Sequence, residues 1–118
     1  MKLSDEGRGG FTLIEVMIIS GIVGLVAIIA VPNLIRARLT AQKSSCIANL
    51  KQIDGAMNQW AVETKKSPTD TYSLTDATLL GYIKGSSLPI CPGGGTYSPG
   101  VNMTASPTCN QSSIGHTL

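Results

Sequence analysis

The feature that most constrains this chain is a long apolar stretch near its N-terminus. Residues 11–35 contain 25 residues, and Glu15 is their only ionisable side chain. As an α-helix the stretch would be about 37 Å long at about 1.5 Å per residue. That length crosses a hydrocarbon core of about 30 Å with some tilt. A buried helix of a soluble protein is the alternative, but it would be unusually long and apolar. The stretch therefore predicts a transmembrane helix.

Composition limits what the rest of the chain builds and does. About 80 residues remain beyond the N-terminal segment. This is near the size at which a small core needs additional stabilisation, such as a disulfide or a bound metal. The net charge is +2, and no basic cluster is interleaved with aromatic residues, so nucleic acid binding is not indicated. The chain has no Ser-His-Asp pattern and no phosphate loop, and His116 is its single histidine. We therefore expect neither catalysis nor a cofactor.

The segment before the apolar stretch is polar and ends in two glycines. Residues 1–10 read MKLSDEGRGG and contain no apolar run, unlike a Sec-type signal peptide. Cleavage after Gly10 would therefore remove a polar leader and leave the apolar stretch in the mature chain.

Glu15 is the costly residue of the apolar stretch. An ionised carboxylate at membrane depth is expensive and is usually partnered or functional. Cleavage after Gly10 would create an α-amine on Phe11, one helical turn away. Glu15 would then pair with that amine in its own chain or in a neighbouring chain, and a pair between chains would fix axial register. The alternative is that Glu15 lies close enough to the helix end to reach the lipid headgroups.

The segment from Gly10 to Glu15, G-F-T-L-I-E, resembles the N-terminal motif of type IV pilins, type II secretion pseudopilins and competence pilins. The run Val31-Pro32-Asn33-Leu34 is also similar to the helix of that family. The resemblance implies that a prepilin peptidase cuts after Gly10 and that the new N-terminus, Phe11, is N-methylated. It also implies that Glu15 neutralises the amine of a neighbouring subunit during assembly.

The same resemblance implies partners and a location. The subunits would form a homo-polymer through their N-terminal helices, with the peptidase, an inner-membrane platform protein and an assembly ATPase as partners. Before assembly the chain would lie in membrane lipid as a single-pass protein of the bacterial inner membrane, N-terminus in the cytoplasm. It would then enter a periplasmic pseudopilus or an extracellular pilus. A minor or priming pilin, and a membrane-anchored binding module that does not polymerise, remain as alternatives.

The flanking charges do not by themselves give that orientation. Lys2 and Arg8 precede the apolar stretch, whereas Arg36, Arg38 and Lys43 follow it. The positive-inside rule leans towards the opposite orientation.

Three residues are expected to loosen the apolar helix. Pro32 lacks a backbone donor and should kink or loosen the turn before it. Gly21 and Gly24 permit close approach of another helix, although their spacing is not GxxxG.

Beyond the apolar stretch, residues 36–66 predict an amphipathic continuation of the same helix. Apolar residues recur every three or four positions, at Ile47, Leu50, Ile53, Met57 and Trp60. This face would pack on a small head, residues 67–118. Lys65 and Lys66, followed by Pro68, predict the end of the helix.

The sequence of the head predicts a short helix and two or three short strands. Thr75 or Asp76 is placed to cap a helix within residues 73–84. Residues 96–98 and 101–104 predict a hairpin through Pro99-Gly100. The expected fold is therefore α+β, with a long N-terminal helix, transmembrane and then amphipathic, and a small antiparallel head like that of type IV pilins.

The chain has three cysteines. A Cys91–Cys109 disulfide would close a loop of about 18 residues and contribute roughly 3 kcal/mol. Cys46 would be a buried free thiol, although its pairing with either other cysteine remains open. A metal site built on Cys91 and Cys109 would need Cys46 and His116 as its further ligands. Because the chain also has no CxxC motif, we expect no metal. A carboxylate calcium site is not expected in the head, because no carboxylate side chain follows Asp76.

Overall fold

The computed structural model describes residues 9–118. Residues 1–8 of the predicted leader lie outside the described residues. The elements are helix α1 (Leu13–Glu63), helix α2 (Ala77–Leu80), strand β1 (Tyr97–Ser98), strand β2 (Thr108–Cys109) and the 3-10 helix η1 (Ser112–Ile114). The chain divides into two compact units at Arg36, inside α1.

Helix α1 begins with a side-chain cap. Thr12 immediately precedes the helix, and its hydroxyl accepts a hydrogen bond from the backbone N–H of Glu15 at 3.3 Å. Threonine at the N-cap with glutamate three residues later is the capping-box pattern. Glu15 lies in the first turn, where its charge also complements the helix dipole.

Helix α1 ends three residues before the predicted position. Lys65 has a φ of 54°, and its N–H donates to the carbonyl of Val62, while the N–H of Lys66 donates to the carbonyl of Ala61. These two bonds form a Schellman motif, which terminates the helix at Glu63. A lysine takes the left-handed position that glycine usually fills, so the sequence carried little signal for this end.

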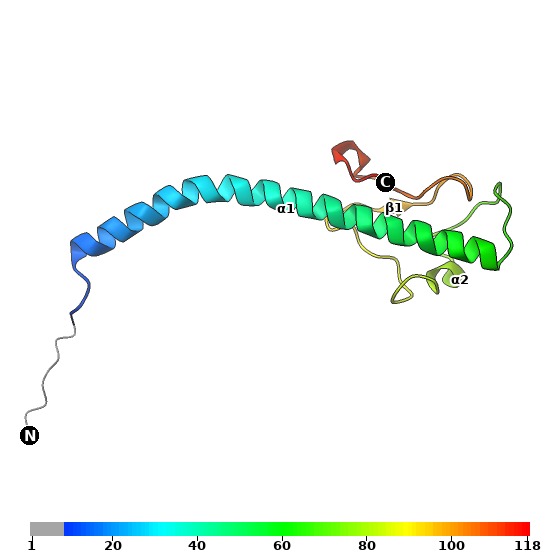
Figure 1. The fold of residues 1–118 in the computed structure, drawn as a ribbon, viewed down its shortest axis with the longest axis horizontal. Helices are drawn as coiled ribbons and strands as arrows, with labels where there is room; N and C mark the ends of the chain where they lie inside the picture. Colours follow the sequence, from blue (N-terminus) through cyan, green and yellow to red (C-terminus); the bar gives the residue numbers. More distant parts are fainter. Residues whose placement is uncertain (1–8) are drawn as a thin grey trace, which may run out of the picture. The chain divides into compact units, whose positions relative to one another are not determined.

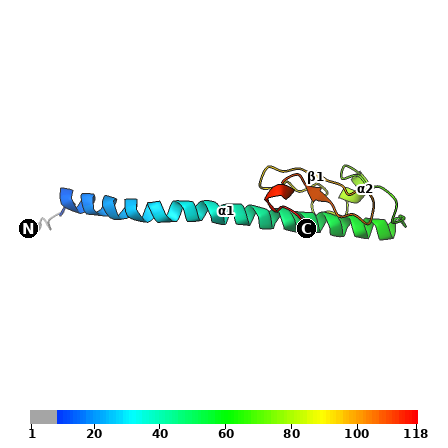
Figure 2. The same ribbon diagram turned by 90° about the horizontal axis from the view of Figure 1, so that it is seen from above.

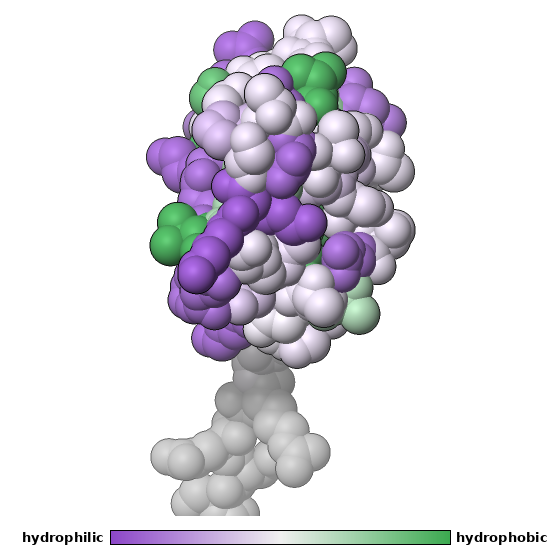
Figure 3. Space-filling view, turned by 90° about the vertical axis from the view of Figure 1, so that its right-hand side faces the viewer, coloured by the Kyte–Doolittle hydropathy of each residue, from purple (hydrophilic) through white to green (hydrophobic). Residues whose placement is uncertain are grey.

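The core of the second unit forms where residues 64–118 pack on α1 (Figures 1 and 2). Four residues of the predicted stripe are buried, and Ile47, the fifth, is half-buried. The buried residues of α1 are Cys46, Leu50, Ile53, Ala56, Met57 and Trp60. They meet side chains from the later loops and α2: Tyr72, Leu74, Leu79, Ile83 and Met103. The end of this unit in Figure 3 is mostly hydrophilic or intermediate, with isolated hydrophobic residues, as expected for a surface that faces water.

Trp60 anchors this core, as its place in the stripe predicted. The side chain is buried, and its indole N–H donates to the Thr78 hydroxyl at 3.1 Å. The Lys66 ammonium lies 5.2 Å from the centre of the ring. The indole therefore has a polar partner, a cation over its face and an apolar environment.

The predicted cap of the short helix is confirmed. Asp76 precedes α2 and accepts a hydrogen bond from the backbone N–H of Thr78 at 2.9 Å. A hydrogen bond from the Thr78 hydroxyl, followed by this backbone bond, lowers the pKa of Asp76. Helix α2 thereby places Leu79 in the core.

The predicted hairpin partner was wrong. β1 pairs antiparallel with β2, with Tyr97 opposite Cys109, instead of with residues 101–104. Those residues form turns because their backbone groups find other partners. The N–H of Met103 donates to the carbonyl of Asp70 at 3.0 Å, and the Asn102 side chain accepts from the N–H of Thr104 at 3.1 Å.

The α+β fold of a long N-terminal helix with a small antiparallel sheet is confirmed. Among the described residues, α1 is the one helix long and apolar enough to cross a membrane, judged by length and composition. The division of α1 and the following residues into functional segments at residues 35 and 66 stays a prediction.

We expect Leu79→Ala to lower the free energy of unfolding by about 2–5 kcal/mol, because it removes a fully buried side chain from the core. Ile90→Ala is the control, since Ile90 is exposed and its truncation should change stability by less than about 0.5 kcal/mol. Urea unfolding of the detergent-solubilised chain, followed by Trp60 fluorescence, measures both. Equal effects of the two variants would contradict this description of the core.

Candidate functional site

Residues 11–35 expose an apolar surface on all sides. Sixteen large hydrophobic side chains in this segment are between 49% and 79% exposed. A water-soluble monomer rarely leaves a contiguous apolar patch larger than a few hundred Å² uncovered. This surface therefore has to be covered by lipid or by other protein.

Glu15 lies on this apolar surface and is exposed. Its neighbours Ile14 and Val16 are exposed hydrophobic residues. Its backbone N–H is satisfied by Thr12. The carboxylate is thus available for a partner outside the chain, and its assembly role stays a prediction.

The three residues predicted to loosen the helix lie within a continuous α1. Pro32 is inside the helix without ending it. A Cβ placed on Gly21 or on Gly24 would meet no atom within 4 Å, so a neighbour could approach there closely. Their role in loosening the helix remains untested.

A buried cluster lies in the second unit. The Cys/His cluster consists of four side chains whose ligand atoms all lie within 4.8 Å of one another: Cys46, Cys91, Cys109 and His116. Each is at most 3% exposed. Cys46 comes from α1, Cys109 from β2, and the other two from loops. All three cysteines are free thiols.

Hydrogen bonds connect the members of the cluster. The Sγ atoms of Cys91 and Cys109 lie 3.8 Å apart, and the Sγ of Cys91 lies 3.5 Å from Nδ1 of His116. The predicted Cys91–Cys109 disulfide is not formed in this structure, so the pairing stays a prediction.

The thiols differ in proton affinity. Burial, followed by the hydrogen bond with Cys91, raises the pKa of Cys46 to about 12. Burial would also raise the pKa of Cys91, but hydrogen bonds from Cys46, from the backbone N–H groups of Gly93 and Gly95, and from His116 outweigh it and lower the pKa to about 6. Negative charge in the cluster is therefore favoured on the Cys91 sulfur.

Glycines allow the loop after Cys91 to pass close to the cluster. A Cβ on Gly93 would lie 2.9 Å from Cε1 of His116, and one on Gly95 would lie 2.7 Å from the Sγ of Cys109. Gly94 has a φ of +79°, and its N–H donates to the Cys91 carbonyl at 3.0 Å. The Gly93–Gly95 run thus wraps its backbone around the sulfur of Cys91.

Two polar side chains fix the edge of the cluster. Asn49 donates to the Tyr97 hydroxyl at 3.1 Å and to the Ile90 carbonyl at 3.2 Å. Tyr97 packs against the cluster, and burial raises its pKa. These contacts position both the loop that carries Cys91 and the strand opposite Cys109.

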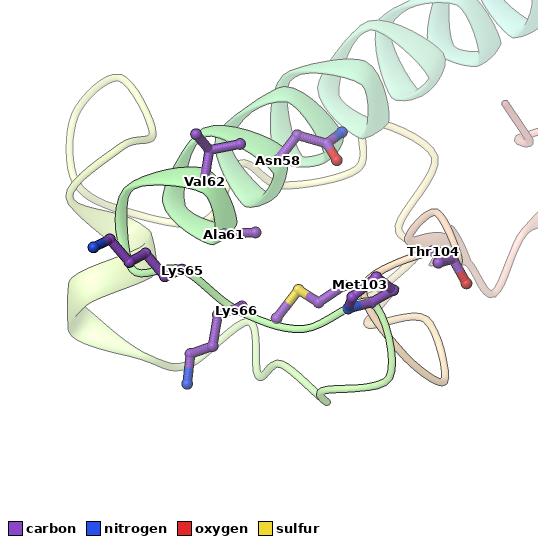
Figure 4. A pocket seen from close by; sticks show the side chains of 8 residues that line it. Asn58, Ala61, Val62, Lys65, Lys66, Met103 and Thr104 are labelled. Atoms are coloured by element: carbon purple, nitrogen blue, oxygen red, sulfur yellow. The ribbon is translucent and has the colours of Figure 1, made fainter.

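A pocket of about 390 Å³ lies between the end of α1 and the loop around Met103 (Figure 4). Asn58, Ala61 and Val62 lie along α1 on one side, and Met103 and Thr104 lie on the other. Its charged lining residues are Lys65 and Lys66. No carboxylate, histidine or cysteine is among the lining residues of this pocket.

An apolar helix with one carboxylate in its first turn, followed by a small head packed on an amphipathic stripe, is the architecture of a pilin-like subunit. Comparison with known proteins agrees. The chain is 31% identical over 110 residues to type II secretion system core protein G of Escherichia coli, covering 82% of this chain and 74% of the relative. It is 29% identical over 85 residues to competence protein ComGC of Bacillus subtilis, covering 72% of this chain and 82% of the relative.

A third relative matches a shorter region. The chain is 41% identical over 54 residues to the type IV major pilin protein PilA of Myxococcus xanthus, covering 46% of this chain and 24% of that protein. No family model matches the chain, and no solved structure matches it. The chain belongs to the type IV pilin and pseudopilin family of structural subunits.

The sequence did not reveal two features of these sites. Thr12 was missed as the helix cap, although the T-x-x-E spacing from Thr12 to Glu15 carried that signal. His116 was treated as an isolated histidine, yet the structure places it beside Cys91. Only the fold brings His116 to the three cysteines, because no short ligand spacing connects them.

We expect Gly95→Ala to destabilise the chain by about 1–3 kcal/mol, because its Cβ would overlap the Cys109 sulfur and the side chains of Asn110 and Gln111. Gly55→Ala is the matched control. A Cβ there meets nothing within 4 Å in a helix, so it should stabilise by about 0.5–1 kcal/mol. The urea midpoints of unfolding of the two variants, compared with that of the parent chain, measure both effects. A Gly95→Ala midpoint at or above that of the parent would contradict the close packing.

Proposed function

We propose that this chain polymerises through residues 11–35 into a filament of the type IV class. The observation that carries the proposal is the apolar surface of this segment, exposed on every side. In the membrane, lipid covers that surface. In a filament, the same segments of neighbouring subunits cover it. Because lipid is as apolar as another helix, assembly depends on side-chain packing and polar pairing and little on the hydrophobic effect.

In this proposal, Gly10 is the residue after which a prepilin peptidase cuts, and Phe11 becomes the methylated N-terminus. Glu15 then accepts the positive charge of the Phe11 amine of a neighbouring subunit. The pair removes two desolvation penalties in a low-dielectric filament core and sets the axial register. Support comes from the position of Glu15 in the first turn of α1, next to exposed apolar side chains.

Gly21, Gly24 and Pro32 have a different role in the proposal. They let the helix loosen while the subunit moves from lipid into the filament. Residues 11–35 thus act first as an anchor and then as the polymer core. Residues 36–66 connect this segment to the head, residues 67–118, which forms the filament surface.

We propose a type II secretion pseudopilus as the filament, because the match to core protein G is longer and more identical (31% over 110 residues) than the match to ComGC (29% over 85 residues), and the type IV major pilin is matched over only 24% of its length. The precursor then lies in the bacterial inner membrane with a cytoplasmic N-terminus, and the pseudopilus grows in the periplasm. A platform protein and an assembly ATPase drive the process. The chain itself has a structural and not a catalytic role.

We expect Glu15→Gln to reduce filament assembly at least tenfold while leaving the amount of membrane-inserted chain unchanged. Glutamine keeps the hydrogen-bonding capacity of a capping box but removes the charge. Filaments released from the periplasm by opening the outer membrane and quantified by immunoblotting, beside the inner-membrane fraction, measure the effect. Assembly at the parental level would show that the charge of Glu15 has no such role.

Thr12→Ala is the matched control for that experiment. It removes the cap and should cost about 0.5–2 kcal/mol of helix stability, but it keeps the carboxylate. We expect its filament yield to stay close to that of the parent chain. A loss as large as that of Glu15→Gln would assign the effect to helix capping.

Intact-mass measurement of the chain from filaments tests processing separately. We expect a mass that corresponds to a chain beginning at Phe11 with one added methyl group. Expression in cells that lack a prepilin peptidase should give the full precursor mass. A filament built from uncleaved chains would contradict the proposed processing.

A further inference from the structure

We propose that one structural Zn²⁺ ion binds to the four side chains of the Cys/His cluster: Cys46, Cys91, Cys109 and His116. The ligand set is Cys₃His, one of the sets that structural zinc sites use. It replaces our sequence-based expectation that the chain holds no metal. The proposal stands apart from the assembly role of residues 11–35, because all four ligands lie in the second unit.

The distances within the cluster fit a zinc site. Zn–S bonds of about 2.3 Å and Zn–N bonds of about 2.0–2.1 Å, arranged as a tetrahedron, place two sulfurs about 3.8 Å apart and a sulfur and a nitrogen about 3.5 Å apart. The Sγ atoms of Cys91 and Cys109 are 3.8 Å apart, and the Sγ of Cys91 lies 3.5 Å from Nδ1 of His116. The remaining pairs lie within 4.8 Å, so shifts of about 1 Å complete the tetrahedron.

The surroundings of Cys91 suit a thiolate ligand. Backbone N–H groups of Gly93 and Gly95 donate to its sulfur, and such donors stabilise the charged form. The two N–H groups therefore leave the Cys91 sulfur in a polar surrounding within an otherwise apolar core.

The loop after Cys91 passes close to His116 and Cys109. Side chains at Gly93 or Gly95 would collide with His116 or Cys109, respectively. A disulfide between Cys91 and Cys109 would not require the loop to clear His116 as well. The glycines therefore fit a centre in which four side chains converge.

A pocket borders the cluster at His116. This pocket of about 370 Å³ is lined by residues of α1, including Leu39 and Lys43, and by Gly93, Ile114 and His116. The histidine thus forms part of a pocket wall while its ring lies in the buried cluster.

Zinc would stabilise a head that has little regular structure of its own. The described residues after α1 contain one four-residue α-helix, one three-residue 3-10 helix and two strands of two residues each. Domains of this size commonly need a metal or disulfides in addition to their core. A four-ligand centre connects α1, the Cys91 loop, β2 and the segment after η1 at one point.

The test uses the full chain, extracted from membranes in detergent without reductant or chelator. Elemental analysis should find about one zinc per chain, and native mass spectrometry should find the same ion bound. Replacing zinc by Co²⁺ should give the intense visible absorption of tetrahedral cobalt thiolate. Zinc-free protein, with the thiols either free or joined in a disulfide, would overturn the proposal.

Variants separate zinc from the Cys91–Cys109 disulfide. Cys46→Ala and His116→Ala should each lower the zinc content at least about tenfold and lower Tm. His116→Cys should retain zinc, because Cys₄ is also a structural set. Ser45→Ala, at the exposed neighbour of Cys46, is the control and should bind zinc like the parent chain. Parental zinc content in both alanine variants would overturn the assignment of the ligands.

If an alanine variant does not accumulate, the parent chain can still be used to test whether zinc stabilises the head. Titration with a strong chelator should release the zinc and lower Tm, and added Zn²⁺ should restore the original Tm. A Tm that does not change on zinc removal would contradict the structural role.

Discussion

The second unit depends on one apolar stripe of α1, from Cys46 to Trp60. The sheet that follows has two strands of two residues, so ladder hydrogen bonds contribute little to holding the loops in place. Burial against the stripe supplies the main driving force. Individual side-chain bonds then fix the loops. The Tyr72 hydroxyl accepts from the N–H of Gly100 at 2.8 Å and donates to the carbonyl of Ala105 at 3.2 Å.

The same helix carries two different apolar patterns, and each predicts its own environment. Residues 11–35 are apolar on all sides, which suits lipid or a packed bundle of helices. Residues 46–60 are apolar on one side only, which suits a head on one face and water on the other. Glu15 is the exception in the first pattern. Its N–H already belongs to the cap with Thr12, so the carboxylate is the part of the residue that assembly would use.

Periodicity predicted the helical parts well because each contact repeats every three or four residues. The stripe through Leu50, Ile53 and Met57 and the cap at Asp76 both follow from local sequence. The pairing of β1 with β2 could not be predicted, because a two-residue strand has no alternation to read. The Cys/His cluster was also beyond local signals. Its members come from α1, two loops and β2, and only tertiary packing brings them together.

The position of Cys46 distinguishes what a metal and a disulfide would do for this fold. A Cys91–Cys109 disulfide would close a loop within the head and leave α1 held by packing alone. The Cys/His cluster includes a residue of α1 itself, at the start of the buried stripe. A centre with four ligands would therefore link the head directly to α1. In the proposed assembly, a subunit pulled from lipid through that helix would transmit force to its head. A metal centre that includes Cys46 would then hold the head to α1 in addition to the packing of the stripe.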